Sequence, residues 1–241
     1  MQQKVSVVMN TVNEDVFFLQ RSIESYIQQV RVDMQLLIST VSGDKNIPFI
    51  QNKYPEIQIV EMPKELHPSF HGIKSPKGSF LQLNNALPFF KGEWFTFAGG
   101  NDYAYSNKLA TEIELCIKRE KEICYSAYDY INENNELIKK IYFREYDYEK
   151  HFIGNFVADS SIVSKRLVDK YLPFRVELNN YAYWDLWLRI FKVEGDVFCY
   201  NNHPTWAYMQ DENSMHVKRW KDEKAMAEAK MDKERMLNLH R

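Results

Sequence analysis

The sequence is poor in cysteine and has no marked excess of charge of either sign. Its 241 residues include only three cysteines, Cys116, Cys124 and Cys199, and no two of them form a Cys-x-x-Cys pair. This odd, scattered set is neither a disulfide framework nor a zinc motif, so we expect reduced, packed thiols of a cytosolic protein. Basic residues number 31 and acidic residues 33, a formal net charge of −2. That balance argues against a nucleic-acid-binding protein, which is usually clearly basic.

Long hydrophobic runs are also missing. No window approaches the roughly 18 apolar residues of a membrane span, and residues 1–10 lack the apolar region of a signal peptide. We therefore expect a cytoplasmic protein, with association at a membrane surface left open. What the chain does have is apolar and aromatic side chains, 45% and 15% of its residues, enough for a sizeable core.

Strand-like and helix-like segments alternate along the first part of the chain. Residues 5–10, 34–38 and 57–62 are β-branched or apolar runs followed by polar residues, while residues 16–29 and 48–54 have helical character. Such alternation indicates a parallel α/β sheet.

The segment GEWFTFAGGND at residues 92–102 predicts a central strand that ends abruptly. Its run of large residues at 94–98 fits a strand covered on both faces. Gly99 and Gly100 then allow a sharp turn and a close approach of a ligand. Asn101 and Asp102 follow at the carboxyl end of the strand, which is the edge where open α/β sheets bind ligands.

The second half of the chain is less regular. We predict a loop at 63–78, helices at 79–90, 107–119, 164–171 and 183–191, strands at 123–131, 137–144 and 197–200, and a hairpin turn at 132–136. Residues 156–161 are also strand-like. Residues 218–241 are charged and rich in alanine and methionine, which predicts an exposed amphipathic helix that packs on the domain or serves association.

Several segments in this order resemble the family-2 inverting glycosyltransferases with a GT-A fold. Thr11 and Asn13 match the loop after the first strand of that family, and residues 92–94 and 107–109 match the central strand and the segment that follows it. The helix WDLWLR at 184–189 matches letter for letter. The likeness extends over about residues 5–215 of the chain.

The resemblance implies an α/β, GT-A-like fold: a Rossmann-like, mostly parallel central sheet flanked by helices, here with a C-terminal helical extension. It implies a transferase domain at residues 1–217, with a nucleotide-sugar-binding half at 1–102, an acceptor-binding half at 103–217 and a charged helix at 218–241. The implied reaction moves a sugar from a nucleotide-sugar donor to a glycan or lipid-linked acceptor with inversion, as in the synthesis of surface polysaccharides.

The sequence departs from that family at its acidic motifs. Residues 39–42 lack the usual acid after the second strand, although Asp44 lies nearby, and residues 99–102 keep only Asp102 of the acidic cluster. The Glu-Asp pair that supplies the catalytic base in the family reads Ala182-Tyr183. The family's late Arg and His have no clear counterpart, since the matching positions hold Met209 and Asp211, with His216 close by.

The donor-binding candidates follow the ends of predicted strands, except Asn84, which the resemblance matches in the helix before the central strand. These candidates are Thr11, Asn13, Glu14, Asp44, Asn84, Asn101 and Asp102. Asp102 is also the candidate ligand of a divalent cation, Mn²⁺ or Mg²⁺, because hard cations take oxygen ligands and often only one or two protein carboxylates. The alternatives are a helix cap for Asp102 and turn hydrogen bonds for the loop residues.

An inverting transfer also needs a carboxylate that takes the proton of the acceptor hydroxyl. Asp185 and Glu177 are the candidate catalytic residues, with Asp159 as a third choice. The alternative for Asp185 is a surface ion pair with Arg189, worth only about 0.3–0.5 kcal/mol. For acceptor binding, Trp206 and Tyr208 are candidates for stacking on a sugar.

Cationic side chains in the 63–78 loop offer a substitute for metal charge. His67, His71, Lys74 and Lys77 would fold over the diphosphate, unless the loop is simply solvated.

Two other functions stay open: a non-catalytic relative that binds a glycan or a protein, and a nucleotidyltransferase. The C-terminal helix would dock on the domain, on a second subunit or on an anionic membrane.

Overall fold

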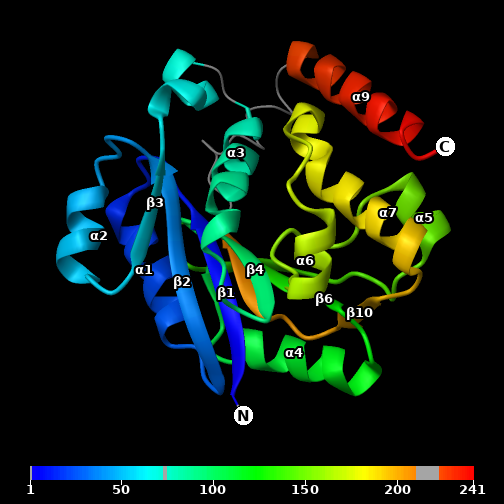
Figure 1. Ribbon diagram of the computed structural model, residues 1–241, viewed down its shortest axis with the longest axis horizontal. Helices are drawn as coiled ribbons and strands as arrows, with labels where there is room; N and C mark the ends of the chain where they lie inside the picture. Colours follow the sequence, from blue (N-terminus) through cyan, green and yellow to red (C-terminus); the bar gives the residue numbers. More distant parts are fainter. Residues whose placement is uncertain (1, 73–74, 210–222) are drawn as a thin grey trace.

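The computed structural model describes residues 2–72, 75–209 and 223–241. Its main sheet has seven strands in the order β10-β6-β9-β4-β1-β2-β3 (Figure 1). Their bounds are β1 (Gln3–Asn10), β2 (Val32–Val41), β3 (Gln58–Met62), β4 (Trp94–Gly99), β6 (Ile123–Ser126), β9 (Ile162–Ser164) and β10 (Phe198–Asn201). All neighbours pair in parallel except β9, which runs antiparallel between β4 and β6. The predicted mostly parallel α/β sheet is confirmed.

Helices cover both faces of this sheet. One face packs on α1 (Val16–Ile27), α2 (Ile47–Lys53) and α4 (Lys108–Arg119), and the other on α3 (Lys77–Ala86), α6 (Lys165–Tyr171) and α7 (Ala182–Glu194) (Figure 1). The alternation of β1 explains this arrangement, because Val5, Val7 and Met9 belong to the first core and Val8 to the second. The β1 and β4 segments are therefore buried on both sides, as their apolar runs predict.

A second, four-stranded sheet has the order β5-β11-β7-β8. Its strands are β5 (Tyr103–Ala104), β7 (Tyr128–Ile131), β8 (Leu137–Ile141) and β11 (Trp206–Met209). The single strand predicted at 123–131 was wrong, since β6 and β7 belong to different sheets. Ala127 separates them, and its N–H donates to the carbonyl of Asn201 (3.0 Å). The predicted hairpin turn is present, with the Asn132 N–H donating to the Glu136 carbonyl (3.1 Å).

Two segments differ from the prediction: short helices occupy most of the predicted loop at 63–78, and a turn replaces the strand-like segment at 156–161. The 63–78 segment contains the 3-10 helices η1 (Lys64–Leu66) and η2 (Pro68–His71), and α3 already begins at Lys77. Further short elements are η3 (Leu87–Phe89), α5 (Tyr148–Ile153) and η4 (Val176–Tyr181). Residues 156–161 form no strand; a turn at 159–160 leads into β9 instead.

The C-terminal helix α9 (Glu223–Asn238) docks on the domain. Its Met236 is fully buried against Leu178, Trp184 and Leu188 of η4 and α7, and Figure 1 shows α9 beside α7. A buried apolar contact therefore anchors the helix, and of the predicted alternatives the structure shows packing on the domain. Over the described ranges, no helix has the length and apolarity needed to cross a membrane.

Candidate functional site

The turn after β4 holds Asp102 in a fixed position. A side chain at Gly99 would meet Asp102 Oδ2 at 2.9 Å, and one at Gly100 would meet the Thr11 Cβ at 3.0 Å. Glycine at both positions therefore lets the turn close on these two side chains. Asp102 Oδ1 accepts a hydrogen bond from the Met209 N–H of β11 (3.0 Å). The turn thus joins the carboxyl edge of the main sheet to the second sheet.

Two carboxyl groups with raised pKa values lie within electrostatic reach of each other near this turn. Burial raises the pKa of Asp102 to about 7; the Met209 N–H and Arg21 oppose the rise, whereas Glu14 and Asp159 add to it. Asp159 lies in the turn before β9, and desolvation raises its pKa to about 7 as well, although its side chain still reaches solvent. A solvent-accessible carboxyl with a strongly raised pKa is a frequent property of catalytic sites.

An aromatic wall on the second sheet stands beside the two carboxyls. It consists of Tyr128 and Tyr130 of β7 and Trp206 and Tyr208 of β11. The rings of Tyr128 and Trp206 are 4.6 Å apart, and those of Tyr130 and Tyr208 are 5.3 Å apart. After burial and Tyr130, the charges of Asp159 and Asp102 also raise the pKa of Tyr128, to about 12. The wall therefore lies within electrostatic reach of both carboxyls.

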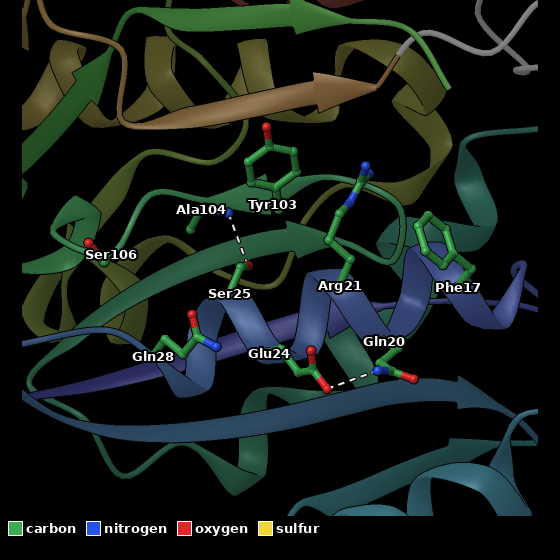
Figure 2. Close-up of a pocket in the computed structure, with 9 residues that line it drawn as sticks. All are labelled: Phe17, Gln20, Arg21, Glu24, Ser25, Gln28, Tyr103, Ala104 and Ser106. Carbon is green, nitrogen blue, oxygen red and sulfur yellow. Dashed lines mark hydrogen bonds between the residues drawn. The ribbon is translucent and has the colours of Figure 1, made fainter. Parts of the chain in front are cut away.

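Arg21 of α1 places a positive charge behind the Asp102 turn. Its Nη2 donates to the Asn101 carbonyl (2.6 Å), and its guanidinium lies 4.7 Å from the centre of the Tyr103 ring. Arg21 also lines a cavity of about 350 Å³ between α1 and β5, shown in Figure 2 with Phe17, Gln20, Glu24, Ser25, Gln28, Tyr103, Ala104 and Ser106. The predicted set of site residues missed Arg21, because nothing in the local sequence of α1 marks it.

The loop residues after β1 and β2 are joined by Asp44. The buried Asp44 carboxylate accepts from the N–H of Asn13 (2.9 Å), the Thr40 hydroxyl (2.6 Å) and the N–H of Asn46 (2.8 Å). Asn13 Oδ1 in turn accepts from the Lys45 N–H (3.0 Å). Asp44 and Asn13 therefore shape the two loops through turn hydrogen bonds. Thr11 is buried next to Gly100, and its Oγ1 has no partner within the described residues.

Asp185 is fully buried, which corrects the expected surface pair. Its Oδ1 contacts Arg175 Nη1 (3.1 Å) and His240 Nε2 (2.9 Å), and its Oδ2 contacts Arg189 Nε (2.8 Å). Burial would raise the pKa of Asp185, but His240, Arg189 and Arg175 together bring it below its ordinary value. Both oxygens are occupied, so this carboxylate has the environment of a structural ion pair.

The other predicted residues occupy separate places. Glu177 is exposed on η4 and, like Asp185, is not among the groups that shift the pKa of Asp102. Asn84 is bound at both ends of its amide by the backbone of Phe174, at 3.0 and 2.8 Å. Of the acceptor candidates, Tyr208 is half-buried in the wall, whereas Trp206 is only 7% exposed and belongs to the core beneath it.

Few side chains near the Asp102 turn could bind a divalent cation. Among the described residues, no group of three or more His, Cys, Asp or Glu side chains is arranged to hold a metal. Asp102 with Asn101 beside it fits a Mg²⁺ or Mn²⁺ ion only if phosphates supply the other ligands, which is usual for such ions.

Two histidines of the predicted cationic loop make local contacts in the structure. His67 is buried by Gly78, where an added Cβ would lie 2.1 Å from His67 Nε2, and its Nδ1 bonds the Ser69 hydroxyl (2.6 Å). His71 Nε2 bonds the Glu65 carbonyl (2.9 Å). Lys74, Asp211 and His216 lie outside the described residues.

Comparison with known proteins relates this architecture to glycosyltransferases. No protein-family model matches the sequence. An uncharacterized glycosyltransferase of Methanocaldococcus jannaschii is 23% identical over 195 residues, which cover 77% of this chain and 63% of that protein. The chain thus spans less than two thirds of this relative.

Solved structures show the same fold. TarS of S. aureus superposes with a TM-score of 0.66 at 13% identity, over 90% of this chain and 38% of TarS. A shorter TarS chain, residues 1–349 with UDP-GlcNAc, gives 0.66 at 12% identity over 98% of this chain and 71% of that chain. The mannosyltransferase PcManGT of Pyrobaculum calidifontis, with GDP-Man and Mn²⁺, gives 0.62 at 11% over 91% and 60%. The fold is that of these glycosyltransferase structures, and the sequence is similar to a glycosyltransferase.

Proposed function

We propose that this chain is an inverting GT-A glycosyltransferase domain of family 2, which moves a sugar from a nucleotide-sugar donor to a glycan or lipid-linked acceptor in the synthesis of a surface polysaccharide or glycoconjugate. The observation that carries the proposal is that Asp102 is hydrogen-bonded to β11 of the aromatic wall and lies within electrostatic reach of Asp159, which comes from a turn far away in the sequence. The similarity to glycosyltransferases in sequence and fold supports it.

The donor would bind at the carboxyl edge of β1 and β4. Thr11 offers a buried hydroxyl without a protein partner among the described residues, and Glu14 lies close enough to Asp102 to raise its pKa. Asp102, with Asn101, would hold a Mn²⁺ or Mg²⁺ ion that neutralises charge on the departing diphosphate. Arg21 adds a fixed positive charge behind the same turn.

Asp159 is the best-placed general base. A base works best with a pKa near the operating pH, and the pKa of Asp159 is raised to about 7. In its ionised form it would take the proton of the acceptor hydroxyl while that oxygen bonds the anomeric carbon. The bond from this carbon to the donor diphosphate breaks on the opposite face. This role replaces the candidates Asp185, whose oxygens are occupied, and Glu177.

The acceptor would lie against Tyr128, Tyr130 and Tyr208. Tyrosine rings offer an apolar face for a sugar ring and a hydroxyl at the tip. Trp206 supports these rings from below. The proposed acceptor half, residues 103–217, contains this wall, although its β6, β9 and β10 complete the sheet of the donor half at residues 1–102. The 218–241 segment, through α9, would then be a structural part of the domain.

Calorimetric titration of nucleoside diphosphates and nucleotide sugars, with and without Mn²⁺, tests the donor site. We expect UDP or GDP and their sugars to bind more tightly with Mn²⁺, and Asp102→Asn to remove the metal dependence. Asp169→Asn, an exposed aspartate of α6, is the matched control. If no nucleotide binds the wild-type protein, the proposal fails. The better account is then a non-catalytic relative that binds a glycan. The presence of Ala182 and Tyr183 in place of the acidic pair favours that alternative.

A further inference from the structure

A buried ion pair on α4 connects the turn of Asp159 to the aromatic wall. Lys108 and Glu112 both have fully buried side chains, and Lys108 Nζ lies 2.7 and 2.9 Å from the two Glu112 oxygens. Bringing two charges out of water is costly, and well-packed apolar residues often serve stability as well or better. The pair therefore has to be explained by something other than stability.

Lys108 also holds the peptide next to Asp159. Its third hydrogen bond goes to the Ser160 carbonyl (2.8 Å), so all three protons of its ammonium group are used. The same carbonyl accepts from the Thr96 hydroxyl of β4 (3.1 Å). The Ser160 carbonyl is thereby fixed from two elements, α4 and β4. Asp159 precedes Ser160 in a turn that closes with the Ser161 N–H donating to the Ala158 carbonyl (3.3 Å).

Glu112 holds the starts of both strands of the wall. Its Oε1 accepts from the hydroxyls of Ser126 (2.7 Å) and Thr205 (2.7 Å). Thr205 directly precedes β11, and Ser126 ends β6 two residues before β7. One buried network thus joins the turn of Asp159 with the strands that carry Tyr128 and Tyr208.

We propose that Lys108 and Glu112 are positioning residues that fix the turn of Asp159 relative to the two strands of the aromatic wall. This inference rests on the proposed function for its catalytic meaning, but the geometric claim does not depend on it. Both residues are fully buried and cannot touch a substrate, so neither is a catalytic residue. Loss of the Lys108 bond to Ser160 would let the turn relax toward water and separate Asp159 from the wall.

The carboxyl titration of Asp159 measures this positioning without any substrate. Carbon-13 NMR of the aspartate carboxyls, assigned with Asp159→Asn, follows it in the full chain. The groups that share its surroundings are Asp102, Tyr128, Tyr183 and Tyr208, so Asp102 is followed in parallel. The test variant is the double substitution Lys108→Met with Glu112→Leu, which leaves no buried charge unpaired. The control is Lys165→Met with Asp169→Leu, an exposed pair at the same i, i+4 spacing on α6.

We expect the Asp159 midpoint, near neutral in the wild type, to fall by at least one pH unit in the double variant and to stay in place in the control. Thr96→Val, which removes the second donor to Ser160, is expected to give a smaller shift in the same direction. An unchanged midpoint in a folded double variant overturns the inference, whatever its thermal stability.

Activity separates this inference from the proposed function. If nucleotides bind the wild type, the double variant should lose kcat by roughly 10-fold or more with donor affinity unchanged. If no nucleotide binds, the proposed function fails while the NMR result still decides the positioning role. If the double variant does not fold, the Asp159 titration is measured in Lys108→Arg and in Thr96→Val instead. A lowered midpoint supports the positioning role, and an unchanged midpoint overturns it.

Discussion

Two desolvated regions of this molecule each centre on an aspartate, and the groups around that aspartate shift its pKa in opposite directions. Around Asp185, the side chains of His240, Arg189 and Arg175 occupy both oxygens and bring the pKa below its ordinary value. Around Asp102, one backbone N–H and a remote arginine are outweighed by desolvation and by other acids, and the pKa is raised to about 7. Desolvation acts on both, although Asp185 is fully buried and Asp102 only half-buried, so desolvation alone does not identify a functional carboxyl. The partners decide whether its charge is already compensated or remains available for a ligand.

The largest expected effect concerns Asp159, which belongs to the Asp102 region. If it is the general base, Asp159→Asn should lower kcat by about 10²- to 10⁴-fold and leave donor binding intact. Transfer from a radiolabelled donor and calorimetric titration measure the two quantities on one sample. Asp169→Asn should change neither. Full activity of Asp159→Asn would show that Asp159 is not the general base, and the Asp102 region would then no longer differ from the Asp185 region in function.

Replacement of Asp185 should affect stability rather than chemistry. Asp185→Asn leaves Arg189 and Arg175 without their anion, and breaking a buried pair on one side typically costs about 3–5 kcal/mol. Urea unfolding followed by circular dichroism measures the loss. The exposed pair of Lys165 and Asp169 is the control, because removing its acid should change the free energy of unfolding by about 0.5 kcal/mol or less. A stable Asp185→Asn variant that loses only activity would return Asp185 to the catalytic candidates.

The two aspartates should also respond to pH with opposite sign. The pKa of Asp102 is higher in the folded than in the unfolded chain, so its contribution is present below about pH 4 and is lost as the pH rises to about 7. The pKa of Asp185 is lower in the folded chain, so its contribution is present above about pH 4 and is lost in acid.

Asp102→Asn should therefore unfold at a higher temperature than the wild type at pH 7.5 and lose this advantage toward pH 4. The expected scale is about 1.4 kcal/mol for each unit by which the pKa is raised. Thermal unfolding between pH 4 and 8 measures it, with the wild type as reference. A difference between the two proteins that does not vary with pH would show that Asp102 is ionised throughout.

The smallest effect is expected at the C-terminal contact with Asp185. His240→Gln keeps an amide donor near Asp185 Oδ1 but weakens the contact, so we expect a loss of about 1 kcal/mol in the free energy of unfolding. The rate of limited proteolysis in α9 should rise by a factor that corresponds to the same loss of free energy. Arg241→Gln, at an exposed neighbouring position, is the control. Equal behaviour of the two variants would mean that the other contacts of α9, with Met236 at their centre, hold the helix without His240.

The fold could be predicted because its signals are local. The runs at β1, β2 and β4 and the helical spacing of α7 each lie within about ten residues. The split of residues 123–131 between two sheets could not be predicted. It depends on the hydrogen bonds that Ala127 makes with Asn201 and Thr205, which lie more than 70 residues further along the chain. The charge of residues 218–241 likewise gives no sign that Met236 fills a buried site on α7.

The candidate site was predictable only up to Asp102. A buried strand followed by Gly99 and Gly100 places Asp102 at the carboxyl edge from sequence alone, because strand, turn and side chain are neighbours in the chain. Which acid lies within electrostatic reach of Asp102 was decided by tertiary structure. Asp185 stands in the matched motif, but Arg175 and His240 occupy it, and the turn of Asp159 is held by Lys108 and Thr96 instead. Desolvation and ion pairing depend on everything that packs around a carboxyl, whereas the pattern of a strand depends only on its own residues.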